Sequence, residues 1–136
     1  MHTDLITGAT GFIGYHLSVR LLREGRNIKL FCRPESKHKL SSFFKGSAEI
    51  VVGDLCDYDS IIHAMHDVER VYHCAGHVLD WGPKETFYST NVQGTRWLLE
   101  ASVKRNITRF IHLSSIAVFG IPSPSYFDDK TPCDPG

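Results

Sequence analysis

The sequence has no long hydrophobic run, no excess of charge and no paired cysteines, and each absence narrows the class of protein. No uninterrupted apolar run approaches the roughly 20 residues that a membrane span needs. Fifteen Lys and Arg balance fifteen Asp and Glu, which disfavours nucleic acid or an anionic membrane as a partner. The four cysteines form no Cys-x-x-Cys pair, which favours free thiols in a reducing compartment. The N-terminus has no pattern typical of a secretory signal, so we expect a cytoplasmic protein.

Short apolar runs alternate with segments of helical spacing along most of the 136 residues. The predicted strands are residues 4–7, 27–32, 48–52, 70–74 and 109–113, and the predicted helices are residues 12–24, 36–44, a segment capped by Asp57, and 84–104. Apolar strands that alternate with helices indicate a parallel sheet covered on both faces. The pattern therefore predicts an α/β fold, a doubly wound Rossmann-type sheet of strand order 3-2-1-4-5.

A glycine-rich turn follows the first predicted strand. Residues 7–14 read TGATGFIG, with Gly8, Gly11 and Gly14 between a strand and a helix. We expect Gly8 to permit a tight turn, Gly11 to let a pyrophosphate approach the backbone, and Gly14 to let the helix pack closely. Thr10, Phe12 and Ile13 belong to the same turn, and we expect them to contact the cofactor together with the three glycines. The motif predicts a dinucleotide site and excludes a P-loop, because no Gly-Lys-Ser/Thr ends it.

Eight histidines raise the possibility of a metal site, which the spacing does not favour. His63 and His66 are three residues apart on a predicted helix, but no second pair of ligands stands at a readable spacing. We therefore expect no metal.

Five motifs in the same order resemble the N-terminal part of the extended short-chain dehydrogenase/reductase family. They are TGATGFIG at residue 7, GDL at 53, HCAG at 73, NVQGT at 91 and LSSIAVFG at 113. The family includes sugar-nucleotide epimerases, dihydroflavonol reductases and 3β-hydroxysteroid dehydrogenases. Residues 1–120 are then the dinucleotide-binding domain. Residues 121–136, with four prolines, are a loop that leads to a catalytic helix and a substrate domain beyond this chain.

The second predicted strand ends at Cys32 and Arg33 follows it, at the place where an Asp or Glu would select NAD. An arginine instead accommodates the 2′-phosphate of NADP, so we expect NADP, with NAD as the alternative. The resemblance implies that Asp54 and Leu55 contact the adenine. It also implies that Ala75 and Gly76 lie along the cofactor ribose.

Further family positions fall late in the chain. Asn91, on the longest predicted helix, would hold the loop and cofactor region near the fourth strand, although a purely structural role is equally open. Ser115 matches the catalytic serine, which would hydrogen-bond a substrate carbonyl or hydroxyl, and Ser114 would contact the nicotinamide half. Trp81 follows the fourth strand, where it would meet an apolar substrate or pack on its own domain.

The segment YFDDK places Tyr126 and Lys130 at the four-residue spacing of the family's catalytic tyrosine and lysine. Prolines at 124 and 132 flank the segment and exclude a regular helix. In the family the pair also lies about two dozen residues beyond the serine, whereas Tyr126 is eleven beyond Ser115. We predict that the spacing is coincidental and that the true pair lies past Gly136.

The sequence therefore predicts the dinucleotide-binding part of an oxidoreductase that transfers a hydride between a nicotinamide and a secondary alcohol or ketone. A sugar-nucleotide epimerase or dehydratase is the alternative enzyme. A redox-sensing nucleotide-binding module or an inactive remnant is the alternative outside the enzymes. The resemblance also implies a small-molecule substrate for the whole protein, and a homodimer formed through the helix of residues 84–104.

Overall fold

Five parallel strands form one sheet in the order β3-β2-β1-β4-β5, which confirms the predicted topology. The computed structural model describes residues 3–120 and 126–134. The strands are β1 (Thr3–Thr7), β2 (Asn27–Cys32), β3 (Glu49–Val52), β4 (Arg70–His73) and β5 (Arg109–His112). Strand β1 lies at the centre, where Leu5 pairs with Lys29 of β2 and Val71 of β4. Because β1 to β4 pair in parallel, their carboxyl ends lie at one edge of the sheet.

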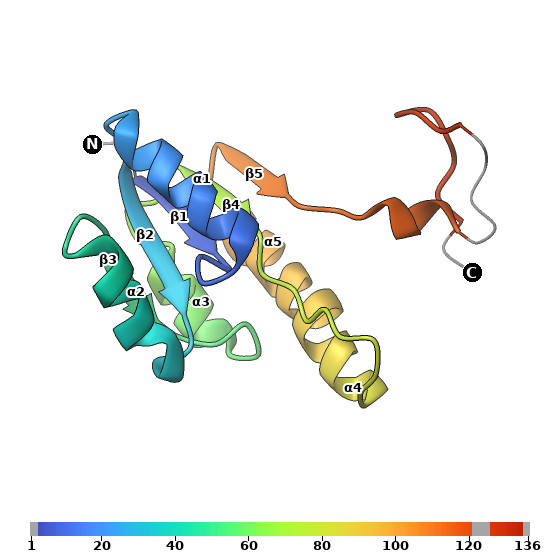
Figure 1. Cartoon of the computed structure of the whole chain (residues 1–136), viewed down its shortest axis with the longest axis horizontal. Helices are drawn as coiled ribbons and strands as arrows, with labels where there is room; N and C mark the ends of the chain where they lie inside the picture. The colour runs from blue at the N-terminus through green and yellow to red at the C-terminus, as the bar shows by residue number, and fades with distance from the viewer. Residues whose placement is uncertain (1–2, 121–125, 135–136) are drawn as a thin grey trace.

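Helices cover both faces of the sheet (Figure 1). Side chains of a strand alternate between the faces, so Leu5 packs against α3 (Tyr58–Ala64) and α5 (Thr95–Lys104). Ile6 faces the opposite way, towards α1 (Phe12–Arg23) and α2 (Lys37–Phe44). Each face buries its own cluster of apolar residues, and the two faces together position the sheet edge that carries the site.

The ends of two helices follow the signals in the sequence. Gly25 adopts a positive φ of 74° just after α1, and the amide of Arg26 donates to the carbonyl of Leu21. Asp57 caps α3, because its Oδ1 accepts from the amide of Asp59 at 3.1 Å. The first helix thus ends within one residue of its predicted end at 24, and the expected cap at Asp57 is confirmed.

The long helix of residues 84–104 is helical throughout but not α-helical throughout. It comprises α4 (Lys84–Phe87), a π-helical segment (Tyr88–Gly94) and α5. Within it, the hydroxyl of Thr95 donates to the carbonyl of Asn91 at 2.7 Å and competes there with the ordinary backbone amide donor. The sequence predicts one α-helix here, since apolar spacing carries no information on such a local change.

Residues 113–120 and 126–134 lead away from the sheet (Figure 1). Strand β5 ends at His112, one residue earlier than predicted and before the serines. The 3-10 turn Ile116–Phe119 packs on the last described segment, where the rings of Phe119 and Phe127 stack at 4.6 Å. Tyr126 and Lys130 lie outside any helix, and Tyr126 is exposed. Part of the expected proline-rich loop, residues 121–125 and 135–136, lies outside the described residues.

Across residues 3–120 and 126–134, the structure contains no helix that is both long enough and apolar enough to cross a membrane.

Candidate functional site

A cavity of about 420 Å³ opens at the carboxyl edge of the sheet, where β1 to β4 end. Eight of the predicted site residues line it: Gly8, Thr10, Gly11, Arg33, Asp54, Leu55, Ala75 and Gly76. The residues come from the four loops that follow β1 to β4, which is the place where doubly wound sheets bind nucleotides.

Different structural constraints require glycine at Gly8 and at Gly14 of the first turn. Gly8 has a φ of 76°, and a Cβ there would lie 2.6 Å from the backbone nitrogen of Ala75. A Cβ on Gly14 would overlap the Gly8 carbonyl oxygen, so only glycine lets the first turn of α1 pack this closely on the loop. These two glycines allow the turn, the helix and the β4 loop to approach each other.

Gly11 is different, because the protein leaves space beside it. Its backbone is extended (φ −85°, ψ 171°), and a Cβ would meet only the Gly8 carbonyl oxygen, at 3.4 Å. Gly11 is also the N-cap of α1, and no side chain caps this helix end. The open N-terminus of a 12-residue helix, beside a residue without a side chain, fits the pyrophosphate of a dinucleotide.

Asp54 and Leu55 line the cavity after β3. The Asp54 carboxylate is half-buried, and its Oδ1 accepts from the amide of Cys56 at 2.8 Å. Leu55 is buried, and a Cβ on Gly94 would lie 2.9 Å from the Leu55 Cβ. Gly94 thus allows close packing of the long helix on this loop. Because Asp57 caps α3, Asp54 is not needed for that role.

Arg33 lines the cavity just after β2, with a largely exposed side chain. Its guanidinium Nε lies 3.2 Å from Oε1 of Glu35, which is also exposed. Ser36 lines the same part of the cavity, and its amide donates to the Arg33 carbonyl. The sequence pattern did not single out Glu35 as the ion-pair partner of Arg33.

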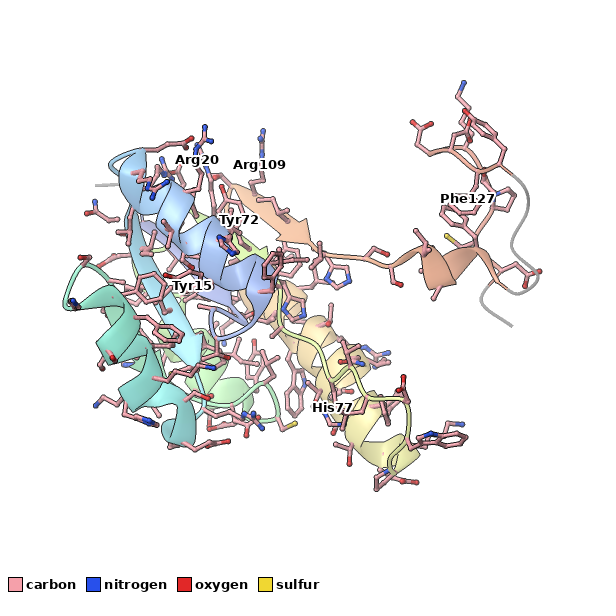
Figure 2. The ribbon with its side chains drawn as sticks, in the orientation of Figure 1. Tyr15, Arg20, Tyr72, His77, Arg109 and Phe127 are labelled. Atoms are coloured by element: carbon pink, nitrogen blue, oxygen red, sulfur yellow. The ribbon has the colours of Figure 1, made fainter. Side chains whose placement is uncertain are left out.

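The loop after β4 is held by Thr7 and Asn91. The Thr7 hydroxyl accepts from the amide of Ala75 at 3.1 Å. The Asn91 side chain binds the backbone of His77 twice: its Oδ1 accepts from the amide at 2.7 Å and its Nδ2 donates to the carbonyl at 3.0 Å. His77 lies against the long helix (Figure 2), and its ring contacts Phe87. Asn91 does not line the cavity, so it acts on the site through this loop.

His73 at the end of β4 is buried and joins two elements of the structure. Its Nδ1 lies 2.7 Å from the Thr7 hydroxyl, and its Nε2 lies 2.9 Å from the Thr95 hydroxyl on α5. Its ring stacks on His112 with centroids 5.2 Å apart. Burial, with a smaller contribution from the neighbouring His112, lowers the pKa of the imidazole from 6.5 to about 4. His73 is therefore neutral at pH 7.

The structure does not bring all the predicted site residues to the cavity. Ser114 and Ser115 follow β5 in the exposed segment, and the Ser115 hydroxyl accepts from the amide of Ala117 at 3.2 Å. Phe12 and Ile13 are exposed on the first turn of α1, and Gly14 is buried below it. Trp81 is 89% exposed, so its packing on this domain is not found.

Several cavity residues were missed by reasoning from the sequence. They are Thr7, Ala9, Phe31, Cys32, Ser36, Gly53, Cys56, Cys74, His77, Thr86, Ser89 and Thr90. Most of these residues directly precede or follow a predicted site residue at the end of a strand. Their position at a strand end is the feature of the sequence that could have identified them. Thr86, Ser89 and Thr90 lie on the long helix, away from any strand end, so the sequence did not identify them. Burial raises the pKa of the Cys32 and Cys74 thiols, which keeps them protonated.

No group of three or more His, Cys, Asp or Glu side chains that could hold a metal ion occurs in the described part of the chain.

A parallel sheet of this order, with a glycine turn and an open helix N-terminus at its carboxyl edge, defines a Rossmann-type dinucleotide-binding domain. A profile of the NAD dependent epimerase/dehydratase family matches residues 5–136. The chain belongs to this family, as the resemblance of its motifs predicted.

Three relatives illustrate the range of the family. Sterol demethylase protein B of Methylococcus capsulatus is 36% identical over 120 residues, which are 88% of this chain and 36% of that protein. A putative dihydroflavonol 4-reductase of Synechocystis is 32% identical over 127 residues, 93% of this chain and 36% of that protein. The crystal structure of a short-chain dehydrogenase/reductase superfamily protein of Agrobacterium tumefaciens with bound NAD superposes with a TM-score of 0.81. It is 28% identical, over 99% of this chain and 40% of that one. The chain thus spans about a third of the length of the curated relatives it matches.

Proposed function

We propose that this chain binds the dinucleotide of an oxidoreductase that transfers a hydride between a nicotinamide and a secondary alcohol or ketone. The observation that supports this most directly is the open space beside Gly11 at the uncapped N-terminus of α1. When bound, the dinucleotide supplies the hydride-accepting or hydride-donating ring. The residues described here hold it: the glycine turn at the pyrophosphate, and Asp54 with Leu55 at the adenine.

We propose NADP as the preferred cofactor. Arg33 lies at the cavity wall after β2, with Ser36 beside it, and both can donate hydrogen bonds to a 2′-phosphate. The Arg33–Glu35 pair is exposed on both sides, so it is weak and a doubly charged phosphate can replace Glu35 as the partner.

In the whole protein, Ser115 would orient the carbonyl or hydroxyl of the substrate next to a tyrosine that transfers the proton. Among the relatives, one is named a sterol-4-alpha-carboxylate 3-dehydrogenase (Mus musculus) and another a UDP-glucose 4-epimerase (Rickettsia rickettsii). Sterols and flavonoids are therefore the first substrates to assay, with UDP-sugars as the alternative class.

We also propose that the long helix pairs two copies of the whole protein. Four apolar side chains on it are exposed at the spacing of one helix face: Tyr88, Val92, Leu99 and Val103.

Titration of the chain with NADP⁺ and NAD⁺ by calorimetry tests the cofactor assignment. Arg33→Ala should weaken NADP⁺ binding by about 1.5–3 kcal/mol, since it removes a charged hydrogen bond to the 2′-phosphate, and should leave NAD⁺ binding nearly unchanged. Arg23→Ala, on the last turn of α1 and away from the cavity, is the matched control for loss of one positive charge. Equal losses for the two dinucleotides would overturn the assignment of Arg33, and no binding of either would overturn the function.

A further inference from the structure

A continuous chain of hydrogen bonds runs from β1 through β4 to the long helix. The Thr95 hydroxyl has one hydrogen, and it donates this hydrogen to the Asn91 carbonyl, which can only accept. Towards His73 the Thr95 oxygen must therefore accept, so Nε2 of His73 carries the proton. A neutral imidazole has one such proton, which leaves Nδ1 as an acceptor.

The same reasoning fixes the other end of the chain. Because Nδ1 of His73 accepts, the Thr7 hydroxyl must donate to it at 2.7 Å. The lone pairs of the Thr7 oxygen remain for the amide of Ala75, which donates to it at 3.1 Å. Each of these four hydrogen bonds therefore has a defined donor and acceptor, and every proton in them has an acceptor.

Each end of this series of hydrogen bonds belongs to a residue that contacts the backbone of the loop lining the dinucleotide cavity. One end holds the amide of Ala75, and Thr7 directly precedes the glycine turn at Gly8. The other end is Asn91, whose side chain holds the amide and carbonyl of His77. The loop of residues 75–77 is thus hydrogen-bonded to Thr7 of β1 and to Asn91 of the long helix. His73 connects β1 to the long helix through Thr7 and Thr95.

We infer that His73 is a positioning residue of the dinucleotide site. As the neutral tautomer with its proton on Nε2, it links Thr7 to Thr95 and holds the loop of residues 75–77 in the shape that receives the ribose. The side chain does not line the cavity, and therefore it acts through the loop rather than by contact. The inference deepens the proposed function and rests on it for the identity of the ligand.

Thr95→Val tests the link, because valine has the shape of threonine but cannot accept from Nε2, and Thr95 does not line the cavity. At pH 7 we expect dinucleotide affinity to fall by roughly tenfold, as for the loss of one net hydrogen bond. Thr95→Ser keeps the hydroxyl and should restore affinity. Ser102→Ala is the matched control, since Ser102 is a buried hydroxyl of the same helix that donates to its own i−4 carbonyl at 2.7 Å. Parental affinity in folded Thr95→Val, or an equal loss in Ser102→Ala, would overturn the inference.

Two measurements without ligand keep the inference separate from the proposed function. Long-range ¹⁵N–¹H spectra of the chain should show His73 with a proton on Nε2 alone at pH 7, and a proton on Nδ1 would overturn the assignment. Hydrogen exchange of the Ala75 and His77 amides should be at least several-fold faster in Thr95→Val than in the parent chain and Ser102→Ala. Unchanged exchange of both amides would show that the chain of hydrogen bonds does not hold the loop, whether or not a dinucleotide binds.

Discussion

At the scale of single residues, the site depends most on a position where a side chain is missing. Gly8 and Gly14 are glycines because other backbone atoms lie where a Cβ would be. Gly11 has an extended backbone that any residue can adopt, and only its own turn lies near it. The protein itself therefore gives no steric reason for glycine at 11, which is the pattern expected where a ligand approaches the backbone.

Gly11→Val should therefore abolish dinucleotide binding and leave the fold intact, because the added methyl groups occupy the approach of the pyrophosphate. We expect affinity for both NADP and NAD to fall by about a hundredfold or more, or about 2.7 kcal/mol. Calorimetric titration, with circular dichroism to confirm folding, measures this. Gly82→Ala is the control, since Gly82 lies in an exposed loop outside the cavity. Unchanged affinity in folded Gly11→Val would refute the phosphate assignment.

At the scale of elements, the sheet and the long helix are joined by a group that can be titrated. The imidazole of His73 accepts from β1 and donates to α5 only while it is neutral. The groups that face it are uncharged hydroxyls on β1 and α5, and His112 on β5. No carboxylate is among these partners to stabilise the protonated ring, so acid should break this connection between the elements.

The free energy of unfolding should consequently fall as the pH is lowered from 6.5 towards 4, the interval between the two pKa values of His73. The pKa of His73 is about 4 in the folded chain and 6.5 in the unfolded chain, so the unfolded state binds the proton more tightly. The contribution of the neutral ring is present in full above pH 6.5 and is lost progressively as the pH falls towards 4. It amounts to about 3 kcal/mol at most.

Urea unfolding at pH 7.5, 6 and 5 measures this effect. His73→Asn cannot titrate, so its stability should depend less on pH than that of the parent chain over this range. His38→Asn changes an exposed histidine on α2 and should keep the parental slope. Parallel pH profiles for the parent and His73→Asn would contradict the assignment.

At the scale of the whole molecule, the described residues form a dinucleotide-binding cavity, but Ser115, Tyr126 and Lys130 do not line it. Ser115 lies in the segment that leads away from the sheet, and Tyr126 and Lys130 lie beyond it outside any helix. Figure 2 shows Phe127, the neighbour of Tyr126, far from the sheet edge at which the cavity opens. Tyr126 is not among the residues that line the cavity.

The segment YFDDK should therefore be dispensable for turnover. In a protein in which the chain continues past Gly136, Tyr126→Phe with Lys130→Ala should retain nearly the full kcat with NADPH and a ketone substrate. Residues 1–136 alone should show no turnover, because loss of a general acid costs about 10²–10⁴ in rate. Ser115→Ala in the longer protein is the positive control and should reduce kcat. A fall of about a hundredfold in the double variant would show that Tyr126 and Lys130 are the catalytic pair.

By itself the sequence determined the order of the elements, the strand order and the location of the site at the ends of the strands. These follow from local signals: apolar periodicity, Gly25 and Asp57 at helix ends, and glycines between a strand and a helix. Most cavity residues stand within a few positions of such a signal, which is why eight of them were found from the sequence.

Only the tertiary structure decided how distant residues meet. Thr7, His73 and Thr95 are far apart in the chain, and each alone is unremarkable in a strand or a helix. The π-helical turn before Thr95 and the contact of Gly94 with Leu55 likewise depend on packing between elements. A buried polar group must form its hydrogen bonds with whatever groups the fold brings next to it, and these can be distant in the sequence.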